Sequence, residues 1–262
     1  MSPVSIPQPT VTAPERARLF FLYHELRAGR SEYSYVVQAE QFRQHLALFA
    51  SLRHSTKYLL WPEITFDDGH ISNHDIAAPL LAPHGIAAHF FITAGWAGTR
   101  PGYMGWEQLR ALANAGHIIG AHGWSHALLT RCSDEELQGE LSRSRMALED
   151  KLGAPVTTMS LPGGRQNARV LAACSAAGYL QVFTSMPSPA PFPLGRIVGR
   201  LNILASMQTE WLAQVLDPST AILASMERKQ RIKDMAKALL GDRLYEKLWS
   251  VVNRSEQEGP AA

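Results

Sequence analysis

Two short clusters of polar residues have the types and spacing that metal chemistry requires. The first contains Asp67 and Asp68, followed by a glycine, directly after the strand-forming residues 64–66. The second contains His122 and His126, directly after a short apolar run. One carboxylate and two histidines four residues apart could bind a metal ion and leave coordination positions open for water and substrate. The two clusters therefore predict a metal site.

An isolated Asp-Asp-Gly sequence also has a purely structural explanation. It can form a turn that caps a helix, here one starting near Ser72 or Asn73. The histidine cluster makes a purely structural explanation of Asp-Asp-Gly less adequate, because it also follows a predicted strand and so places a second polar cluster at a strand end. Active sites of α/β proteins collect at the carboxyl ends of strands.

Strands and helices alternate along most of the chain. This alternation favours parallel βαβ units, arranged as a barrel or as an open sheet. Beyond residue 209 the pattern is helical only, with helices expected over 209–216, 221–240 and 242–253. The expected strands are 19–25, 64–66, 86–92, 118–120, 156–159, 179–184 and 196–203, and the expected helices between them are 39–52, 72–82, 106–115, 133–152 and 168–177.

Composition excludes several classes of protein. The 262 residues are 46% hydrophobic and 18% charged, as in an ordinary globular protein. A net charge of +2 is too small for a nucleic-acid-binding surface, so we expect no DNA or RNA partner. Cys132 and Cys174 are too few for a disulfide framework and lack the spacing of a zinc ribbon.

The two ends of the chain have distinct compositions. Residues 1–17 are rich in proline and predict a flexible arm. No apolar run has the length of a signal peptide core or a transmembrane helix, which predicts a cytoplasmic protein. The C-terminal helices are basic between Arg228 and Lys237, which indicates a solvated face or, as the alternative, peripheral contact with an anionic membrane.

The two clusters and the sequence around them resemble the first two motifs of the NodB-homology polysaccharide deacetylases, carbohydrate esterase family 4. The similarity covers roughly residues 19–204. It implies a distorted (β/α)7-8 TIM-like barrel, which we expect over residues 18–216, followed by a helical extension over 217–262. It also implies a divalent metal ion, commonly Zn²⁺, with Co²⁺, Ni²⁺ or Mn²⁺ as alternatives.

The resemblance also implies roles for the residues of the two clusters. The metal ligands correspond to Asp68, His122 and His126, and the catalytic base corresponds to Asp67. Hydrolysis of an N-acetyl group needs an activated water, stabilisation of an oxyanion and a proton for the leaving amine. A zinc ion with three protein ligands can supply the first two, and Asp67 would take the proton of the water.

The third family motif departs from its usual form. Ser160 stands where the family has an arginine that pairs with the catalytic aspartate. Arg200 on the last strand or Arg165 could replace this arginine, and we favour Arg200. Pro162 and Gly163 keep their places in the motif and are expected to contact substrate, with the backbone N–H of Gly163 serving the oxyanion.

The histidine of the last family motif is missing, since no histidine follows His126. A subgroup similar to the poly-N-acetylglucosamine deacetylases of exopolysaccharide pathways carries it on an N-terminal strand after a tyrosine, as in Tyr23-His24 here. The first and last strands of a closed barrel are neighbours, so a proton donor can move from one chain end to the other. The resemblance therefore implies that His24 is the general acid, although a lone histidine is more often structural.

The leading hypothesis is a metal-dependent hydrolase that removes N-acetyl groups from an amino sugar in a polysaccharide, an oligosaccharide or its precursor. Trp96, Tyr103 and Trp124 would line the carbohydrate groove, with filling of the core as the alternative for Trp96 and Tyr103. One alternative is hydrolysis of another carbon-nitrogen bond, in a small cyclic or linear amide. Another is a catalytically silent carbohydrate-binding homologue, which the missing arginine of the third motif favours.

Overall fold

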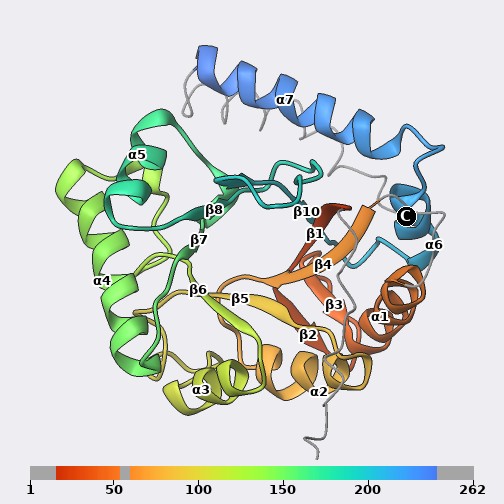
Figure 1. The fold of residues 1–262 in the computed structure, drawn as a ribbon, viewed down its shortest axis with the longest axis horizontal. Coiled ribbons are helices and arrows are strands. Elements are labelled where there is room, and N and C mark those ends of the chain that lie inside the picture. Colours follow the sequence, from red (N-terminus) through yellow and green to blue (C-terminus); the bar gives the residue numbers. More distant parts are fainter. Residues whose placement is uncertain (1–15, 54–59, 241–262) are drawn as a thin grey trace, which may run out of the picture.

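The computed structural model describes residues 16–53 and 60–240, and eight parallel strands form its central sheet. In spatial order the sheet runs β10, β1, β4, β5, β6, β7, β8, β9. Figure 1 shows these strands curving around a common axis. The strands are β1 (Ala17–Tyr23), β4 (Leu60–Phe66), β5 (Ala88–Ile92), β6 (Ile118–Ala121), β7 (Thr158–Ser160), β8 (Gln181–Phe183), β9 (Ile197–Val198) and β10 (Arg200–Asn202).

A single segment of chain brings the two edges of the sheet together. β9 pairs with β8, whereas β10 pairs with β1, and only Gly199 separates β9 from β10. A side chain at Gly199 would overlap the Ser188 hydroxyl and the Met186 carbonyl, so the chain can pass here only as glycine. The result is a nearly closed parallel barrel, which confirms the predicted TIM-like architecture.

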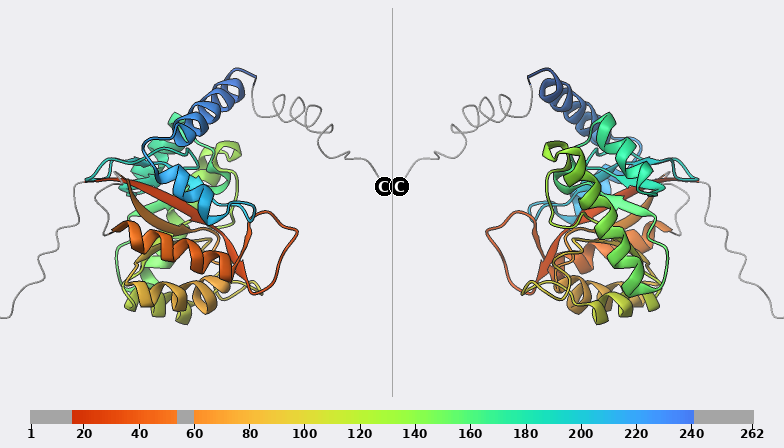
Figure 2. Two further views of the ribbon diagram at one scale, coloured as in Figure 1. Left: turned by 90° about the vertical axis from the view of Figure 1, so that its right-hand side faces the viewer. Right: turned by 90° about the vertical axis from the view of Figure 1, so that its left-hand side faces the viewer.

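Helices cover the outside of the barrel (Figure 1). They are α1 (Ala39–Arg53), α2 (Ala78–Leu81), α3 (Trp106–Asn114), α4 (Asp134–Leu152), α5 (Ala168–Ala176) and α6 (Thr209–Leu216). The last described helix, α7 (Ile222–Leu240), projects from the body of the molecule (Figure 2). Short single turns are the π-helical η1 (Asn73–Ala77) and the 3₁₀ segments η2 (Ala82–His84), η3 (Leu129–Arg131) and η4 (Pro162–Gly164).

A small two-stranded sheet stands outside the barrel. β2 (Glu25–Arg27) pairs with β3 (Val36–Gln38), directly after the carboxyl end of β1. Residues 28–35 connect these strands and form the loop that protrudes from the body in Figure 2. This loop lies at the same end of the barrel as the strand tips that follow Tyr23 and Phe66.

Strand alternation divides the core into two layers. Outward-facing side chains such as Phe21, Phe66 and Phe90 pack in the main core under the helices. Inward-facing Phe20 and Phe91 join Phe183 in a separate cluster that fills the barrel. The interior is therefore a packed core and not a pore.

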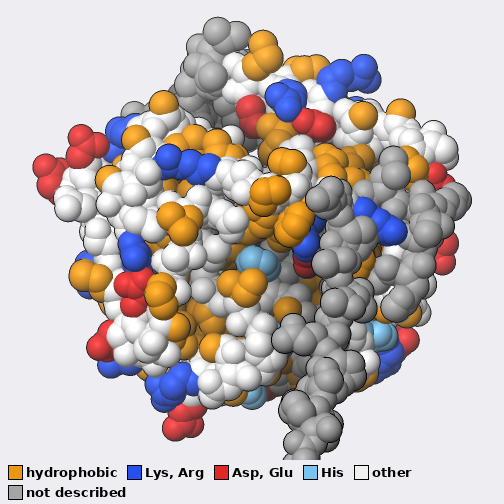
Figure 3. Space-filling view, in the orientation of Figure 1, with side chains coloured by type: hydrophobic (Ala, Val, Ile, Leu, Met, Phe, Trp, Pro, Cys, Tyr) orange, Lys and Arg blue, Asp and Glu red, His pale blue; other side chains and the backbone are white. Residues whose placement is uncertain are grey.

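The surface and the chain ends complete the description. Side chains of both charge signs are interspersed on the face shown in Figure 3, without one large basic patch. Within residues 16–53 and 60–240, no helix combines the length and apolarity needed to cross a bilayer. Ala17, expected in a flexible arm, is the first residue of β1, while the rest of that arm up to residue 15 and the helix expected over 242–253 lie outside the described residues.

Candidate active site at the carboxyl ends of the strands

Asp67 is held by a buried set of hydrogen bonds. Its carboxylate accepts two bonds from Arg200, Nη1 to Oδ1 at 2.7 Å and Nη2 to Oδ2 at 2.9 Å. Ser160 Oγ donates to Asp67 Oδ2 at 2.9 Å and accepts from Arg200 Nη2 at 2.7 Å. Burial would raise the pKa of Asp67, but the charge and hydrogen bonds of Arg200, together with the charges of His122 and His24, outweigh burial and lower this pKa. Asp67 is therefore an ionised carboxylate fixed in orientation.

Contacts inside the barrel fix the position of the Arg200 side chain. Its side chain is fully buried, Nε donates to the Thr184 carbonyl at 3.2 Å, and Nη1 contacts Thr65 Oγ1 at 3.3 Å. The guanidinium lies over the rings of Phe91 and Phe183, with 5.3 Å and 5.9 Å to their centres. The last strand thus brings a cation to the carboxylate of Asp67.

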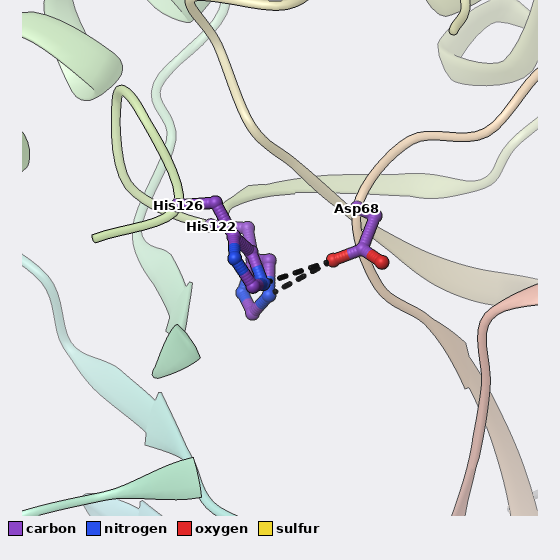
Figure 4. Close-up of side chains that lie close together, drawn as sticks. All are labelled: Asp68, His122 and His126. Atoms are coloured by element: carbon purple, nitrogen blue, oxygen red, sulfur yellow. Dashed lines mark ion pairs between the residues drawn. The ribbon is translucent and has the colours of Figure 1, made fainter. Parts of the chain in front are cut away.

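Asp68 faces two histidines (Figure 4). Its Oδ1 lies 3.3 Å from His122 Nε2 and 3.3 Å from His126 Nε2. The three side chains are the one group of potential metal ligands found among the described residues, and their ligand atoms all lie within 4.8 Å of one another. Asp67 stays apart from this group, with Oδ2 at 3.8 Å from His122 Nε2.

The backbone is strained at two of these three residues. Asp68 (φ 73°) and His126 (φ 65°) are the only residues other than glycine with left-handed backbone in the described part of the chain. This conformation costs a residue with a side chain about 1–2 kcal/mol. Backbone strain of this kind is typical of functional sites, and here it turns the Asp68 carboxylate and the His126 ring toward each other.

The chemistry of this group fits a bound cation. His122 Nδ1 lies 2.9 Å from the Ser160 carbonyl, which can only accept, so Nδ1 carries the proton and Nε2 presents a lone pair toward Asp68. Two acceptors facing each other require a proton or a cation between them. Burial alone would lower the pKa of His122, but the carboxylates of Asp67 and Asp68 outweigh it and raise this pKa. A metal ion would satisfy the same charges.

A carboxylate on α4 holds the loop between the two histidines. Glu140 Oε2 accepts the backbone N–H groups of Trp124 at 2.8 Å and Ser125 at 2.9 Å. Ser125 Oγ also donates to Glu140 Oε1 at 2.6 Å. Three hydrogen bonds to one side chain therefore fix the turn that ends at His126.

His24 lies just beyond the tip of β1. Its Nδ1 is buried and has no hydrogen-bond partner among the described residues, while Asn73 Nδ2 donates to its backbone carbonyl at 2.8 Å. The His24 ring meets the ring of Tyr35 edge to face, 5.2 Å between centres. Burial lowers the pKa of His24, and the carboxylates of Asp67 and Asp68 oppose that shift.

These groups share one open pocket of about 470 Å³. It brings together the predicted base, the predicted acid and the three predicted ligands. Tyr103 and Gly163 also line it, as the sequence predicts for substrate-contacting residues. Its described lining includes His24, Asp67, Asp68, His70, Tyr103, His122, His126, Gly163, Gly164, Ser185 and Asn202.

Three residues predicted to contact substrate are not among those that line this pocket. Trp96 stacks against the His126 ring, 5.4 Å between centres, and so backs a candidate ligand. Trp124 packs against the core under the guanidinium of Arg143, which lies 4.2 Å from its ring centre. Pro162 is buried. Periodicity alone could not separate aromatic residues that face the pocket from those behind it.

Several pocket residues were not predicted from the sequence, and two of them are tyrosines. Tyr33 and Tyr35, in the loop 28–35, line the pocket and are 71% and 40% exposed. Exposed aromatic rings beside a polar site are typical of carbohydrate contacts. The available signal was the pair of tyrosines in the polar stretch 31–35, directly after the strand that carries His24.

Residues 62–182 match the sequence model of a family described as Polysaccharide deacetylase. The protein YxkH of Bacillus subtilis is 30% identical over 127 residues, which are 48% of this chain and 45% of that protein. The peptidoglycan-N-acetylglucosamine deacetylase PgdA of Listeria monocytogenes is 32% identical over 108 residues, 41% of this chain and 22% of that protein. The chain thus spans less than half of the length of these curated relatives.

Solved structures share the fold at low sequence identity. The Streptococcus pyogenes deacetylase PplD, in complex with acetate, superposes with a TM-score of 0.67 at 19% identity, covering 77% of this chain and 99% of that one. IcaB from Ammonifex degensii gives a TM-score of 0.62 at 20% identity, covering 76% and 96%. These comparisons support the barrel architecture.

Proposed function

The chain carries a polysaccharide deacetylase domain, and from this premise we propose that it is a metal-dependent hydrolase that removes N-acetyl groups from amino sugars in a carbohydrate. The observation that supports this most directly is the division between two adjacent carboxylates. Asp67 is clamped by Arg200 and Ser160, whereas Asp68 faces two histidines. One carboxylate is therefore placed for proton transfer and the other for metal binding.

We assign the metal site to Asp68, His122 and His126, with Zn²⁺ as the expected ion. When bound, a divalent cation supplies Lewis acidity that activates water and polarises an amide carbonyl. Nitrogen and carboxylate ligands in this number suit zinc in an open catalytic site. The backbone carbonyl of Ser160 fixes the tautomer of His122, and Trp96 supports the ring of His126.

The remaining roles belong to groups around this site. Asp67 accepts the proton of the attacking water, because its carboxylate is ionised and fixed by Arg200. His24, which lines the same pocket, donates a proton to the leaving amine, and the backbone N–H of Gly163 serves the oxyanion. Arg200 is a positioning residue, since it acts on the reaction through Asp67.

The test is acetate release from N-acetylglucosamine oligomers by metal-stripped protein, with and without added Zn²⁺ or Co²⁺. We expect release only with metal, and a drop of about 100-fold or more in His24→Ala and Asp67→Asn, the range typical of a lost general acid or base. His74→Ala is the matched control, because within the described part of the chain the His74 side chain pairs with its exposed neighbour Asp75 alone. Circular dichroism verifies that each variant is folded.

Two outcomes would contradict the proposal. Tight metal binding without acetate release would indicate a different carbon-nitrogen bond as the substrate. Absence of metal binding, measured by calorimetry on the stripped protein, would refute the assignment of Asp68 and the two histidines.

A further inference from the structure

A second pocket of about 410 Å³ adjoins the catalytic pocket. Both pockets are lined by Gly163, Gly164 and Ser185, so these residues form the border between them. Two of the three border residues have no side chain, and both glycines adopt left-handed backbone, φ 65° and 64°. A ligand in the catalytic pocket could therefore continue across this border into the second pocket.

The far wall of the second pocket comes from α7, which lies outside the segment matched by the family. Gln230 and Asp234, one helical turn apart, line the pocket, and Gln230 Nε2 donates to Asp234 Oδ1 at 2.9 Å. Ile222, Leu223 and Met226 pack the start of α7 against the core. The helix therefore presents a polar pair to the pocket while its cations, such as Arg228 and Lys229, are exposed.

The lining of the second pocket has the chemistry that recognises sugar hydroxyls. Gln166, Asn167 and Gln230 contribute amides, and Ser185 contributes a hydroxyl. Asp234 adds a carboxylate and Arg165 adds a cation. Groups that both donate and accept hydrogen bonds suit a ligand whose hydroxyls do the same.

We propose that the second pocket binds a further sugar unit of the carbohydrate chain whose N-acetyl group occupies the catalytic pocket. This inference rests on the proposed function and narrows its substrate class to oligosaccharides or polysaccharides. Gln230 and Asp234 are then specificity residues for chain length. The C-terminal helix contributes to substrate selection without contacting the reacting atoms.

The experiment compares N-acetylglucosamine oligomers from dimer to hexamer on metal-loaded wild-type protein and on the double variant Gln230→Ala, Asp234→Ala. We expect wild-type kcat/KM to rise with chain length. The double variant should lose about tenfold on the longest oligomers, as expected for two removed hydrogen-bonding groups, and nothing on the shortest oligomer turned over. Alanine maintains the helix, and Lys229→Ala on the exposed face is the matched control.

Binding of the same oligomers to metal-stripped protein, measured by calorimetry, separates this inference from the proposed function. Acetate release that is independent of chain length, and equal in the double variant, would overturn the second sugar site while leaving the deacetylase proposal intact. Chain-length-dependent binding that the double variant loses, without acetate release, would support the sugar site and refute deacetylation. Absence of oligomer binding would overturn the sugar site.

Discussion

Asp67 and Asp68 are adjacent in sequence but differ in function because the backbone turns between them. Asp67 continues the inward face of β4 and meets Arg200 from β10, which only β1 separates from β4 in the sheet. Asp68 adopts φ 73° and leaves the strand direction, which brings it to the histidines. Burial raises the pKa of a carboxylate, and Arg200, with smaller contributions from His122 and His24, opposes that shift and keeps Asp67 charged.

Removing one partner of this buried pair should destabilise the protein strongly. Arg200→Met leaves the carboxylate of Asp67 buried without its counter-charge, and such losses cost about 3–5 kcal/mol. We expect the free energy of unfolding in urea at pH 7 to fall by this amount. Arg200→Lys keeps the charge but not the two parallel hydrogen bonds, so it should lose less. Equal stability of Arg200→Met and wild type would show that the pair is not held as described.

At the scale of single residues, the sequence predicted which side chains come together better than it predicted the hydrogen bonds that fix them. The contact of Arg200 with Asp67 spans 133 positions in the sequence and forms because β10 pairs with β1, which in turn pairs with β4. The hydrogen bonds of Ser160 to both groups were not predicted, because a serine in place of an arginine was interpreted as a loss. Tyr33 and Tyr35 lie in an irregular loop, where no periodicity indicates the direction of a side chain.

Among the elements, α4 is connected most directly to the candidate metal site. Ser133 and Glu136 form the predicted capping box, with bonds of 3.2 Å from Glu136 N to Ser133 Oγ and 2.7 Å from Ser133 N to Glu136 Oε2. This cap fixes where the helix begins. Glu140 follows one turn later and reaches the loop that carries His126.

Glu140→Gln should therefore weaken metal binding without touching a ligand. An amide provides only one acceptor oxygen for three donors, so the turn before His126 loses part of its support. We expect metal affinity to fall about tenfold, the lower end for a residue that supports a ligand. Calorimetric titration with Zn²⁺ or Co²⁺ measures this, and Glu135→Gln, exposed on the same helix, is the control. An affinity equal to that of wild type would mean that the turn keeps its conformation without the hydrogen bonds to Glu140.

Element boundaries were predictable where local signals exist. The helix expected over 39–52 is α1 (Ala39–Arg53), and the capping box set the start of α4. Three features had no such signal. The pairing of β2 with β3 is a tertiary contact, the helix expected over 72–82 begins as a π turn, and the last strand divides at Gly199 because neighbouring backbone crowds it. These departures depend on packing and not on propensity.

For the whole molecule, the filled interior has a consequence for stability against acid. His89 lies inside the barrel against Phe20, Phe91 and Phe183, with ring centres 5.7, 6.0 and 5.4 Å away. Burial lowers its pKa from the ordinary 6.5 to about 4. His45, on the buried face of α1, has its pKa lowered to about 4 for the same reason. Both rings are therefore neutral in the folded protein at pH 5, where the unfolded chain protonates them.

The sign of the pH effect follows from this difference. Between pH 6.5 and about 4 the unfolded chain binds more protons than the folded protein, so stability falls as the pH falls through this window. Each histidine adds up to about 1.4 kcal/mol per pH unit to the slope. His89→Leu should remove one such contribution, so the stability of the variant should depend less steeply on pH than that of wild type.

Urea unfolding of metal-stripped protein between pH 4 and 8 measures the difference. Above pH 7 the stability curves of variant and wild type should run parallel, because His89 is protonated in neither the folded nor the unfolded state there. Parallel curves down to pH 4 would mean that His89 takes up its proton inside the folded barrel, and the interior would then have to contain a counter-charge or water beside that ring.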